Sequence, residues 1–285
     1  MKAVEIRAGP LPPPERNSAR PVARAHGTRT HPSMSQMIEL FDDYEVSFDD
    51  YEASLDSSGD SSPLICEYRD AVCLHFDGSH VQSAMYKHAP NELLLSYTRT
   101  MMNFLAFNNQ PRHVGIIGLG GGSIPKYCYR RLPDTAISVA EISPEVIALR
   151  DRFLIPKDDH RFRIYCEDGA HFVRRQSAHF DVLLIDGFDD NGQPPQLCSR
   201  QFYSHCYRSL TSPGLLVVNV CDGEHLISRI RRSFRNQVIV ADGGDSSSNT
   251  IVFAGKGNIL AASQWPLKTE AIARRLPINP LAMIA

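Results

Sequence analysis

The 285-residue chain lacks the features that would place it in a membrane, on nucleic acid or around a metal ion. No apolar run approaches the roughly 20 residues that a membrane helix needs. Its 30 lysines and arginines stand against 32 aspartates and glutamates, and a net charge of −2 leaves no basic excess for nucleic acid. Histidines and cysteines do not cluster at ligand spacings, so we expect no bound metal.

The cysteines also lack the pattern of a disulfide framework. There are seven of them, an odd number, with no CxxC spacing, and no signal peptide precedes them. We therefore expect reduced thiols in a soluble, cytoplasmic protein. With 42% hydrophobic residues the chain can bury a sizeable core, enough for one large domain and a smaller one.

Uneven charge sets the first 62 residues apart. Residues 1–33 carry six lysines or arginines against two glutamates and are broken by prolines, whereas residues 34–62 carry nine acids and no lysine or arginine. FDDYEVS at Phe41 is repeated as FDDYEAS at Phe48, with aromatic residues at helical spacing. This repeat is either an acidic arm that attracts a polyamine or basic partner, or, as we favour, a solvated face whose aromatic stripe packs on the body. We expect residues 1–62 to form a flexible segment.

A small β unit is expected next, over residues 63–108. Short β-like runs span Leu64 to Tyr68 and Val72 to Phe76, and a turn follows at Asp77-Gly78. After a break at Pro90, apolar residues at helical spacing predict a linking helix from Glu92 to about Phe107.

Strands and helices alternate in the remaining residues, 109–285. Strands are predicted at His113 to Ile117, Ile137 to Glu141, Arg161 to Tyr165, Val182 to Ile185 and Leu215 to Val220. Helices are predicted at Ile124 to Arg131, Pro144 to Arg152, Ala170 to Arg175 and Gln201 to Leu210. Such alternation implies an α/β, Rossmann-like, doubly wound parallel sheet, whose ligands bind at the carboxyl ends of the strands.

A glycine turn, GLGGGS, follows the first of these strands. Gly118, Gly120 and Gly122 leave no side chains where the backbone turns from strand into helix, so a ligand can approach exposed N–H groups closely. The dinucleotide pattern GxGxxG would have glycine where Ser123 stands. Glu141 is placed to accept ribose hydroxyls in either a dinucleotide or a nucleoside site.

Acidic residues end three successive strands and separate these two ligands. Glu141, Asp168 and Asp186 follow the second, third and fourth strands. The two phosphates of a dinucleotide would be repelled by this edge of the sheet, whereas a nucleoside bearing a sulfonium would be held by it. The sequence therefore favours S-adenosylmethionine chemistry.

Five short motifs then occur in an order and spacing typical of one family. They are GLGGGS at Gly118, AEIS at Ala140, EDG at Glu167, IDGFDD at Ile185 and LTSPG at Leu210. They resemble GGGDGG, VEID, GDG, VDSSDP and LRPGG of the spermidine synthase, or polyamine aminopropyltransferase, family. DGSHVQ at Asp77 resembles the family's DG-x-x-Q hairpin, and Tyr97 falls at its YHE motif. The resemblance spans about Ile65 to Lys256 and implies an S-adenosylmethionine-methyltransferase-type sheet behind a small N-terminal antiparallel β unit.

The resemblance also implies residue roles. Nucleoside binding falls to Gly118, Gly120, Gly122, Glu141, Asp168 and Gly169, with Glu141 as the ribose ligand and Asp168 as a contact to adenine. Asp186 becomes the catalytic base, Asp189 the anchor of the amine, and Gln82 and Tyr97 line the substrate pocket. A base is needed because an alkylamine with a pKa of about 10.4 is protonated at neutral pH and cannot attack. The alternative for Asp186 is a strand-end acid that bonds the next loop, and for Asp189 an exposed loop acid.

The chain departs from the family at several positions, and one of them concerns the donor. Gly121 stands where GGGDGG has the acid that holds the ammonium of the decarboxylated tail. The leading hypothesis is aminopropyl transfer from decarboxylated S-adenosylmethionine to a polyamine or other amine. The alternatives are methyl transfer from S-adenosylmethionine itself and a non-catalytic nucleoside-binding protein. The resemblance suggests a homodimer or larger assembly, and we expect no nucleic-acid or membrane partner.

Overall fold

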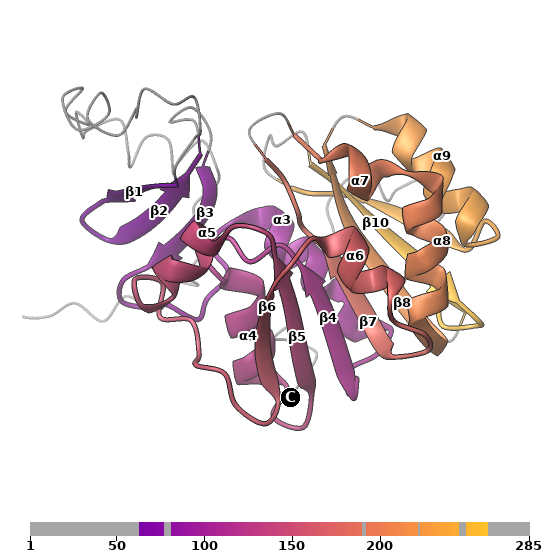
Figure 1. Cartoon of the computed structure of the whole chain (residues 1–285), viewed down its shortest axis with the longest axis horizontal. Coiled ribbons are helices and arrows are strands. Elements are labelled where there is room, and N and C mark those ends of the chain that lie inside the picture. The colour runs from indigo at the N-terminus through magenta and orange to yellow at the C-terminus, as the bar shows by residue number, and fades with distance from the viewer. Residues whose placement is uncertain (1–62, 77–80, 190–191, 222, 245–248, 262–285) are drawn as a thin grey trace, which may run out of the picture. The chain divides into compact units, whose positions relative to one another are not determined.

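The computed structural model describes residues 63–76, 81–189, 192–221, 223–244 and 249–261 (Figure 1). All of them belong to one compact unit, Pro32–Ala285. The predicted flexible segment with its acidic repeat, the Asp77-Gly78 turn and Asp190 lie outside the described residues.

The N-terminal sheet has three antiparallel strands in the order β1-β2-β3. They are β1 (Leu64–Glu67), β2 (Ala71–His75) and β3 (Val81–Tyr86). The small antiparallel unit is thus confirmed, and its first two strands lie within one residue of their predicted bounds. The third strand had not been predicted as an element of its own, although it carries Gln82 of the expected hairpin.

The larger sheet has seven strands in the order β6-β5-β4-β7-β8-β10-β9. They are β4 (His113–Ile117), β5 (Ala136–Glu141), β6 (Phe162–Cys166), β7 (Phe180–Ile185), β8 (Leu210–Cys221), β9 (Val238–Asp242) and β10 (Asn249–Lys256). Strands β4 to β8 are parallel, as predicted. The prediction of a wholly parallel sheet is wrong at its edge, because β10 and β9 form an unpredicted antiparallel hairpin beside β8. The strand order reverses between β4 and β7, where ligands of such sheets bind.

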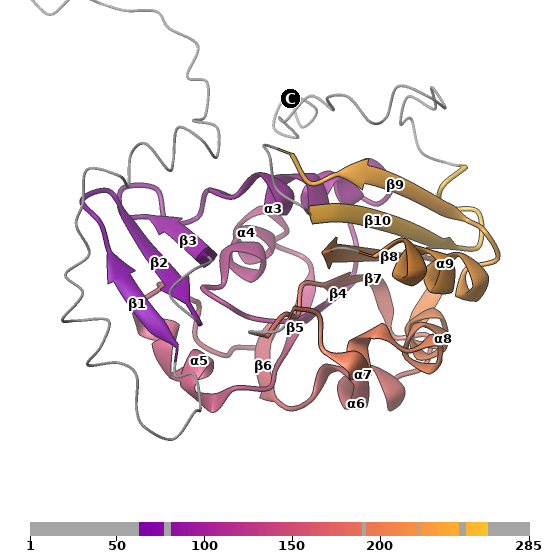
Figure 2. The same ribbon diagram turned by 90° about the horizontal axis from the view of Figure 1, so that it is seen from above.

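Helices cover both faces of this sheet, α6, α8 and α9 on one side and α3 and α4 on the other (Figures 1 and 2). The α-helices are α3 (Ser96–Met101), α4 (Ser123–Arg131), α5 (Pro144–Ala148), α6 (Gly169–Arg174), α7 (Pro195–Cys198), α8 (Arg200–Ser209) and α9 (Glu224–Ser233). Two 3₁₀ turns, η1 (Met102–Ala106) and η2 (Leu149–Asp151), extend α3 and α5. Helices α7 and α9 had not been predicted.

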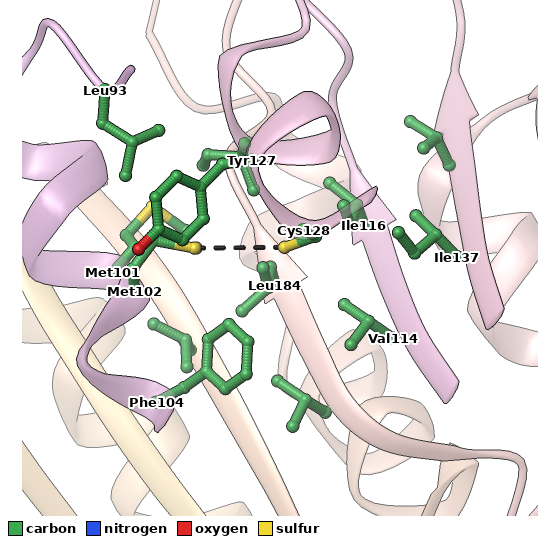
Figure 3. Packing of buried hydrophobic residues seen from close by; sticks show 14 of the residues in the cluster. Leu93, Met101, Met102, Phe104, Val114, Ile116, Tyr127, Cys128, Ile137 and Leu184 are labelled. Atoms are coloured by element: carbon green, nitrogen blue, oxygen red, sulfur yellow. Dashed lines mark hydrogen bonds between the residues drawn. The ribbon is translucent and has the colours of Figure 1, made fainter. Parts of the chain in front are cut away.

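Alternating side chains of the central strands fill a core on each face. In β8, Leu215 and Val217 join the cluster under α3 and α4, while Leu216 and Val218 join the cluster under α6, α8 and α9. Figure 3 shows the first cluster, in which the thiol of Cys128 donates to the sulfur of Met102 over 3.9 Å. Because both faces of such a strand are buried, successive residues along it are apolar, which explains the aliphatic stretches in the sequence.

The linking helix is shorter than predicted because its first turn is replaced by an extended leucine segment. Helix α3 begins at Ser96, and Leu93, Leu94 and Leu95 before it are all buried. The guanidinium of Arg99 donates to the carbonyls of Leu93 and Leu94 over 2.9 and 2.6 Å, so a side chain satisfies carbonyls that a longer helix would have used. The helix predicted to Arg152 likewise ends at Ala148 and continues as η2.

Lys126 of α4 contacts the N-terminal sheet. Its side chain is 1% exposed, and its Nζ donates to the carbonyl of Phe153 over 2.7 Å and to the sulfur of Met85 in β3 over 2.9 Å. No carboxylate among the described residues pairs with it. Burial lowers the pKa of Lys126 from 10.5 to about 8, because the charged form loses its hydration.

This burial predicts a pH-dependent stability. Between about pH 8 and pH 10.5 the unfolded chain retains the Lys126 proton longer than the folded chain does, so this group makes the free energy of unfolding rise with pH, by up to roughly 3 kcal/mol. In Lys126→Met that rise should be absent. Urea unfolding of both proteins from pH 7 to pH 10 measures it, with the exposed Lys87 replaced by Met as the matched control. Parallel curves for Lys126→Met and wild type would contradict the assignment.

Candidate active site

A pocket lies at the carboxyl ends of the parallel strands, beside the point where the strand order reverses. It contains about 900 Å³ of empty space, open solvent included. Its walls come from β3, α3, the glycine turn and the ends of β5 and β7. Its lining includes most of the residues predicted from the sequence, namely Gln82, Tyr97, Gly118, Gly120, Glu141, Asp168, Gly169 and Asp186.

The glycine turn requires glycine because of its positive φ angles and its close contacts with neighbouring segments. Gly118 has φ +92°, and a Cβ there would lie 2.1 Å from the carbonyl oxygen of Asp186. Gly120 has φ +49° and lies in the lining. Gly122 has φ +68°, is the N-cap of α4, and faces Ile155 rather than the pocket lining. The turn thus brings β4 against the end of β7 and leaves a side-chain-free floor at Gly118 and Gly120.

The missing family acid has a structural explanation at Gly121. A Cβ at this position would lie 2.7 Å from the hydroxyl of Ser83 and 2.9 Å from the ring of Phe153. Position 121 therefore faces the packing between β3 and Phe153, and Gly121 is not among the pocket-lining residues. A carboxylate there would require the Ser83 hydroxyl and the Phe153 ring to move.

Glu141 ends β5 with its carboxylate held in one orientation. Its Oε2 accepts from the amide of Leu119 over 2.8 Å, and its Oε1 accepts from the amide of Ser143 over 2.9 Å. A carboxylate offers about four acceptor sites, so each oxygen can take a further hydrogen bond. Glu141 thus supports the glycine turn and still offers a fixed acceptor to vicinal hydroxyls in the pocket.

Asp168 lines the pocket and also caps a helix. It is the N-cap of α6, where its Oδ1 accepts from the amide of His171 over 2.8 Å. Gly169 follows it and packs so closely that a Cβ would lie 2.4 Å from Ile117. The cap orients the acid at the rim of the pocket, and its predicted contact with adenine stays a prediction.

Asp186 lies immediately after β7 and accepts two side-chain hydrogen bonds. Its Oδ2 accepts from the hydroxyl of Tyr97 over 3.2 Å, and its Oδ1 accepts from the amide of Asn219 over 2.9 Å. Burial raises the pKa of Asp186, and these two bonds only partly oppose the rise. Burial, and then the nearby carboxylate, raise the pKa of Tyr97 well above its usual value. A neutral phenol therefore donates to a carboxylate whose basicity is increased.

Asp189 is not brought into this pocket. It is exposed, and its backbone pairs with Gly192 through N–H···O bonds of 2.8 and 3.1 Å. Its role as an anchor of the amine stays a prediction. Several lining residues had not been predicted, among them Phe76, Ser83, Thr98, Phe188 and Leu197. Asn219 had not been predicted either, although one amide in the apolar run LLVVNV was a visible signal.

The described part of the chain contains neither a cluster of metal ligands nor a membrane-spanning helix. There, no three His, Cys, Asp or Glu side chains are grouped as metal ligands would be. No helix in the same ranges has the length and apolar character needed to cross a membrane.

Comparisons with known proteins agree with this geometry. Residues 94–246 match the family model described as spermine/spermidine synthase domain. The polyamine aminopropyltransferase of Neisseria meningitidis serogroup A is 36% identical over 196 residues, which cover 67% of this chain and 74% of that protein.

Solved structures share the fold. A probable spermidine synthase from Corynebacterium glutamicum superposes with a TM-score of 0.60 at 19% identity, over 68% of this chain and 76% of the other. A spermidine synthase in complex with the transition state analogue AdoDATO gives a TM-score of 0.51 at 21% identity, over 68% and 73%. At these identities the likeness concerns the fold, which is the Rossmann-like one predicted. The family model and the Neisseria relative match the sequence itself, and these two matches show that this chain belongs to the spermine/spermidine synthase family.

Proposed function

We propose that the pocket holds an S-adenosyl nucleoside over the glycine turn and an amine beside Asp186, and that the chain transfers an aminopropyl group from decarboxylated S-adenosylmethionine to that amine. The observation that carries the proposal is the convergence of Glu141, Asp168 and Asp186, from the ends of three strands, on one pocket. The family match favours aminopropyl transfer over methyl transfer.

The nucleoside half of the pocket supplies acceptors and a flat floor. Glu141 would accept hydrogen bonds from the ribose hydroxyls, and Asp168 would contact the adenine base. Gly118 and Gly120 let the nucleoside lie against the backbone. The carboxylates also stabilise the sulfonium charge of the bound donor.

The amine half of the pocket supplies a base. The acceptor arrives as an ammonium, which has no lone pair for attack. Asp186 removes one proton from it, and the raised pKa of Asp186 makes this transfer less unfavourable than it would be to an ordinary carboxylate. Tyr97 donates to the same carboxylate and keeps it oriented. Gln82 lines the pocket from β3.

The displacement itself conserves charge. The nitrogen lone pair forms a bond to the carbon next to sulfur, and the carbon–sulfur bond breaks with its electron pair going to sulfur. The sulfonium becomes the neutral thioether of methylthioadenosine, while the new nitrogen–carbon bond completes the longer amine, whose nitrogen takes over the positive charge. The protein contributes alignment of the two reactants and proton removal.

An activity assay tests the proposed function. The purified protein is incubated with putrescine or spermidine and either decarboxylated or intact S-adenosylmethionine, and the products are identified by mass spectrometry. Methylthioadenosine together with a longer amine is the expected result. S-adenosylhomocysteine would instead indicate methyl transfer. Failure of both donors to react, with methylthioadenosine still raising the melting temperature, would replace the enzyme with a nucleoside-binding protein.

A further inference from the structure

Asn219 is a buried amide in an apolar run of the large sheet. It lies in the run Leu215 to Val220 of β8, between β7 and β10, and is 3% exposed. On its face of the sheet the alternating neighbours Leu215 and Val217 belong to the hydrophobic core. We propose that Asn219 is a positioning residue that fixes the carboxylate of Asp186 for proton removal, an inference that rests on the proposed function.

The hydrogen bond defines the orientation of the amide. Its Nδ2 lies 2.9 Å from Oδ1 of Asp186. An ionised carboxylate only accepts hydrogen bonds, so the NH₂ end of the amide must face it. The carbonyl end, Oδ1 of Asn219, has no hydrogen-bond partner among the described residues.

This half-satisfied amide is unfavourable for the fold alone. A buried acceptor without a partner loses its hydration and gains nothing in return. An aliphatic side chain at position 219 would continue the pattern of Leu215 and Val217 at no such cost. The contact with Asp186 is therefore what distinguishes Asn219 from the residues around it.

Two donors from different elements together lock the carboxylate. Tyr97 of α3 holds Oδ2 and Asn219 of β8 holds Oδ1, so the carboxylate cannot rotate about its Cβ–Cγ bond without breaking one of these bonds. A fixed base is more effective than a mobile one because its lone pair is already aimed at the proton. Cys221, at the end of β8, acts electrostatically on Tyr97 and is the next titratable group in this cluster.

The donor also stabilises the ionised form of Asp186. Burial raises the pKa of this carboxyl and the Asn219 amide opposes the rise. Removing the amide should therefore move the pKa of Asp186 further upward. In a profile of kcat/KM against pH, the acid limb should shift to higher pH by about one unit, the order expected for one hydrogen bond to a charged group.

Three variants separate positioning from packing. Asn219→Leu removes the donor and is expected to lower kcat by about 10- to 100-fold with decarboxylated S-adenosylmethionine and putrescine, while KM for the nucleoside stays unchanged. Asn219→Gln keeps an amide and should retain more activity. Asn108→Ala removes a partly exposed amide that lies outside the pocket lining and accepts from the backbone of Gln110, and should behave as wild type.

The outcomes distinguish this inference from the proposed function. If wild type transfers the aminopropyl group and Asn219→Leu keeps its kcat and acid limb, the inference is wrong. Equal losses in the Leu and Gln variants would assign the effect to packing and also overturn it. If wild type shows no transfer, the proposed function fails, and carboxyl ¹³C NMR of Asp186 tests the contact without turnover. There, an upward pKa shift in Asn219→Leu supports the contact and an unchanged pKa refutes it.

Discussion

Asp186→Asn is expected to lower turnover by roughly 10²- to 10⁴-fold, the usual contribution of a general base. The variant keeps the shape of the side chain but cannot take a proton from the incoming ammonium. Binding of the nucleoside should change little, because Glu141 at the end of β5 and Asp168 after β6 belong to other segments of the pocket. Steady-state kinetics with decarboxylated S-adenosylmethionine and putrescine, together with calorimetric binding of methylthioadenosine, measure the two effects separately.

Stability provides the control for this variant. The pKa of Asp186 is raised in the folded chain, so its ionised form costs folding free energy at neutral pH, and that cost disappears below both its folded and unfolded pKa values. Replacing the carboxylate by an amide should leave the melting temperature at pH 7 unchanged or higher. A large activity loss in a protein of undiminished stability would therefore report chemistry. Full activity in Asp186→Asn would make this residue a structural strand-end acid.

Asp189→Asn is the matched comparison, three residues along the same loop. This acid is exposed and lies outside the pocket lining, so its replacement should leave kcat nearly unchanged. If Asp189 attracts the amine, KM for the amine should rise, because a charged contact is lost in the ground and transition states alike. Equal effects of the two replacements on kcat would contradict the different roles assigned to them.

Gly118→Ala is expected to have the largest effect on stability, about 3–5 kcal/mol. Two effects combine at this position. The backbone has φ +92°, and the added Cβ would lie 2.1 Å from the carbonyl oxygen of Asp186, which forces β4 and the end of β7 apart. Since that carbonyl belongs to the proposed base, nucleoside binding and turnover should be lost together. Urea unfolding and calorimetric binding of methylthioadenosine measure both.

Gly192→Ala separates the cost of a strained backbone from the cost of a steric clash with the added Cβ. Its φ of +104° is similar, but an added Cβ would have nothing within 4 Å. The expected loss is only about 1–2 kcal/mol, the cost of a positive φ for an L-residue. Equal losses in both variants would show that backbone strain alone, and not the contact between the glycine turn and Asp186, requires glycine at position 118.

The parallel core and most of the pocket could be predicted from the sequence alone. Continuous aliphatic runs separated by amphipathic segments have few alternatives to strands buried on both faces, and β4 to β8 follow from them. Residues that follow successive parallel strands must meet at one edge of the sheet. For that reason Glu141, Asp168 and Asp186 could be brought together without a structure.

Features set by contacts between distant segments required the tertiary structure. The hairpin of β9 and β10 depends on pairing with β8, and the late start of α3 depends on Arg99 reaching back to the leucine carbonyls. The same holds within the pocket. Whether position 121 has room for an acid is decided by Ser83 and Phe153, and the orientation of Asp186 by Tyr97 and Asn219, because periodicity reports which face a residue occupies but not which side chain from another element meets it there.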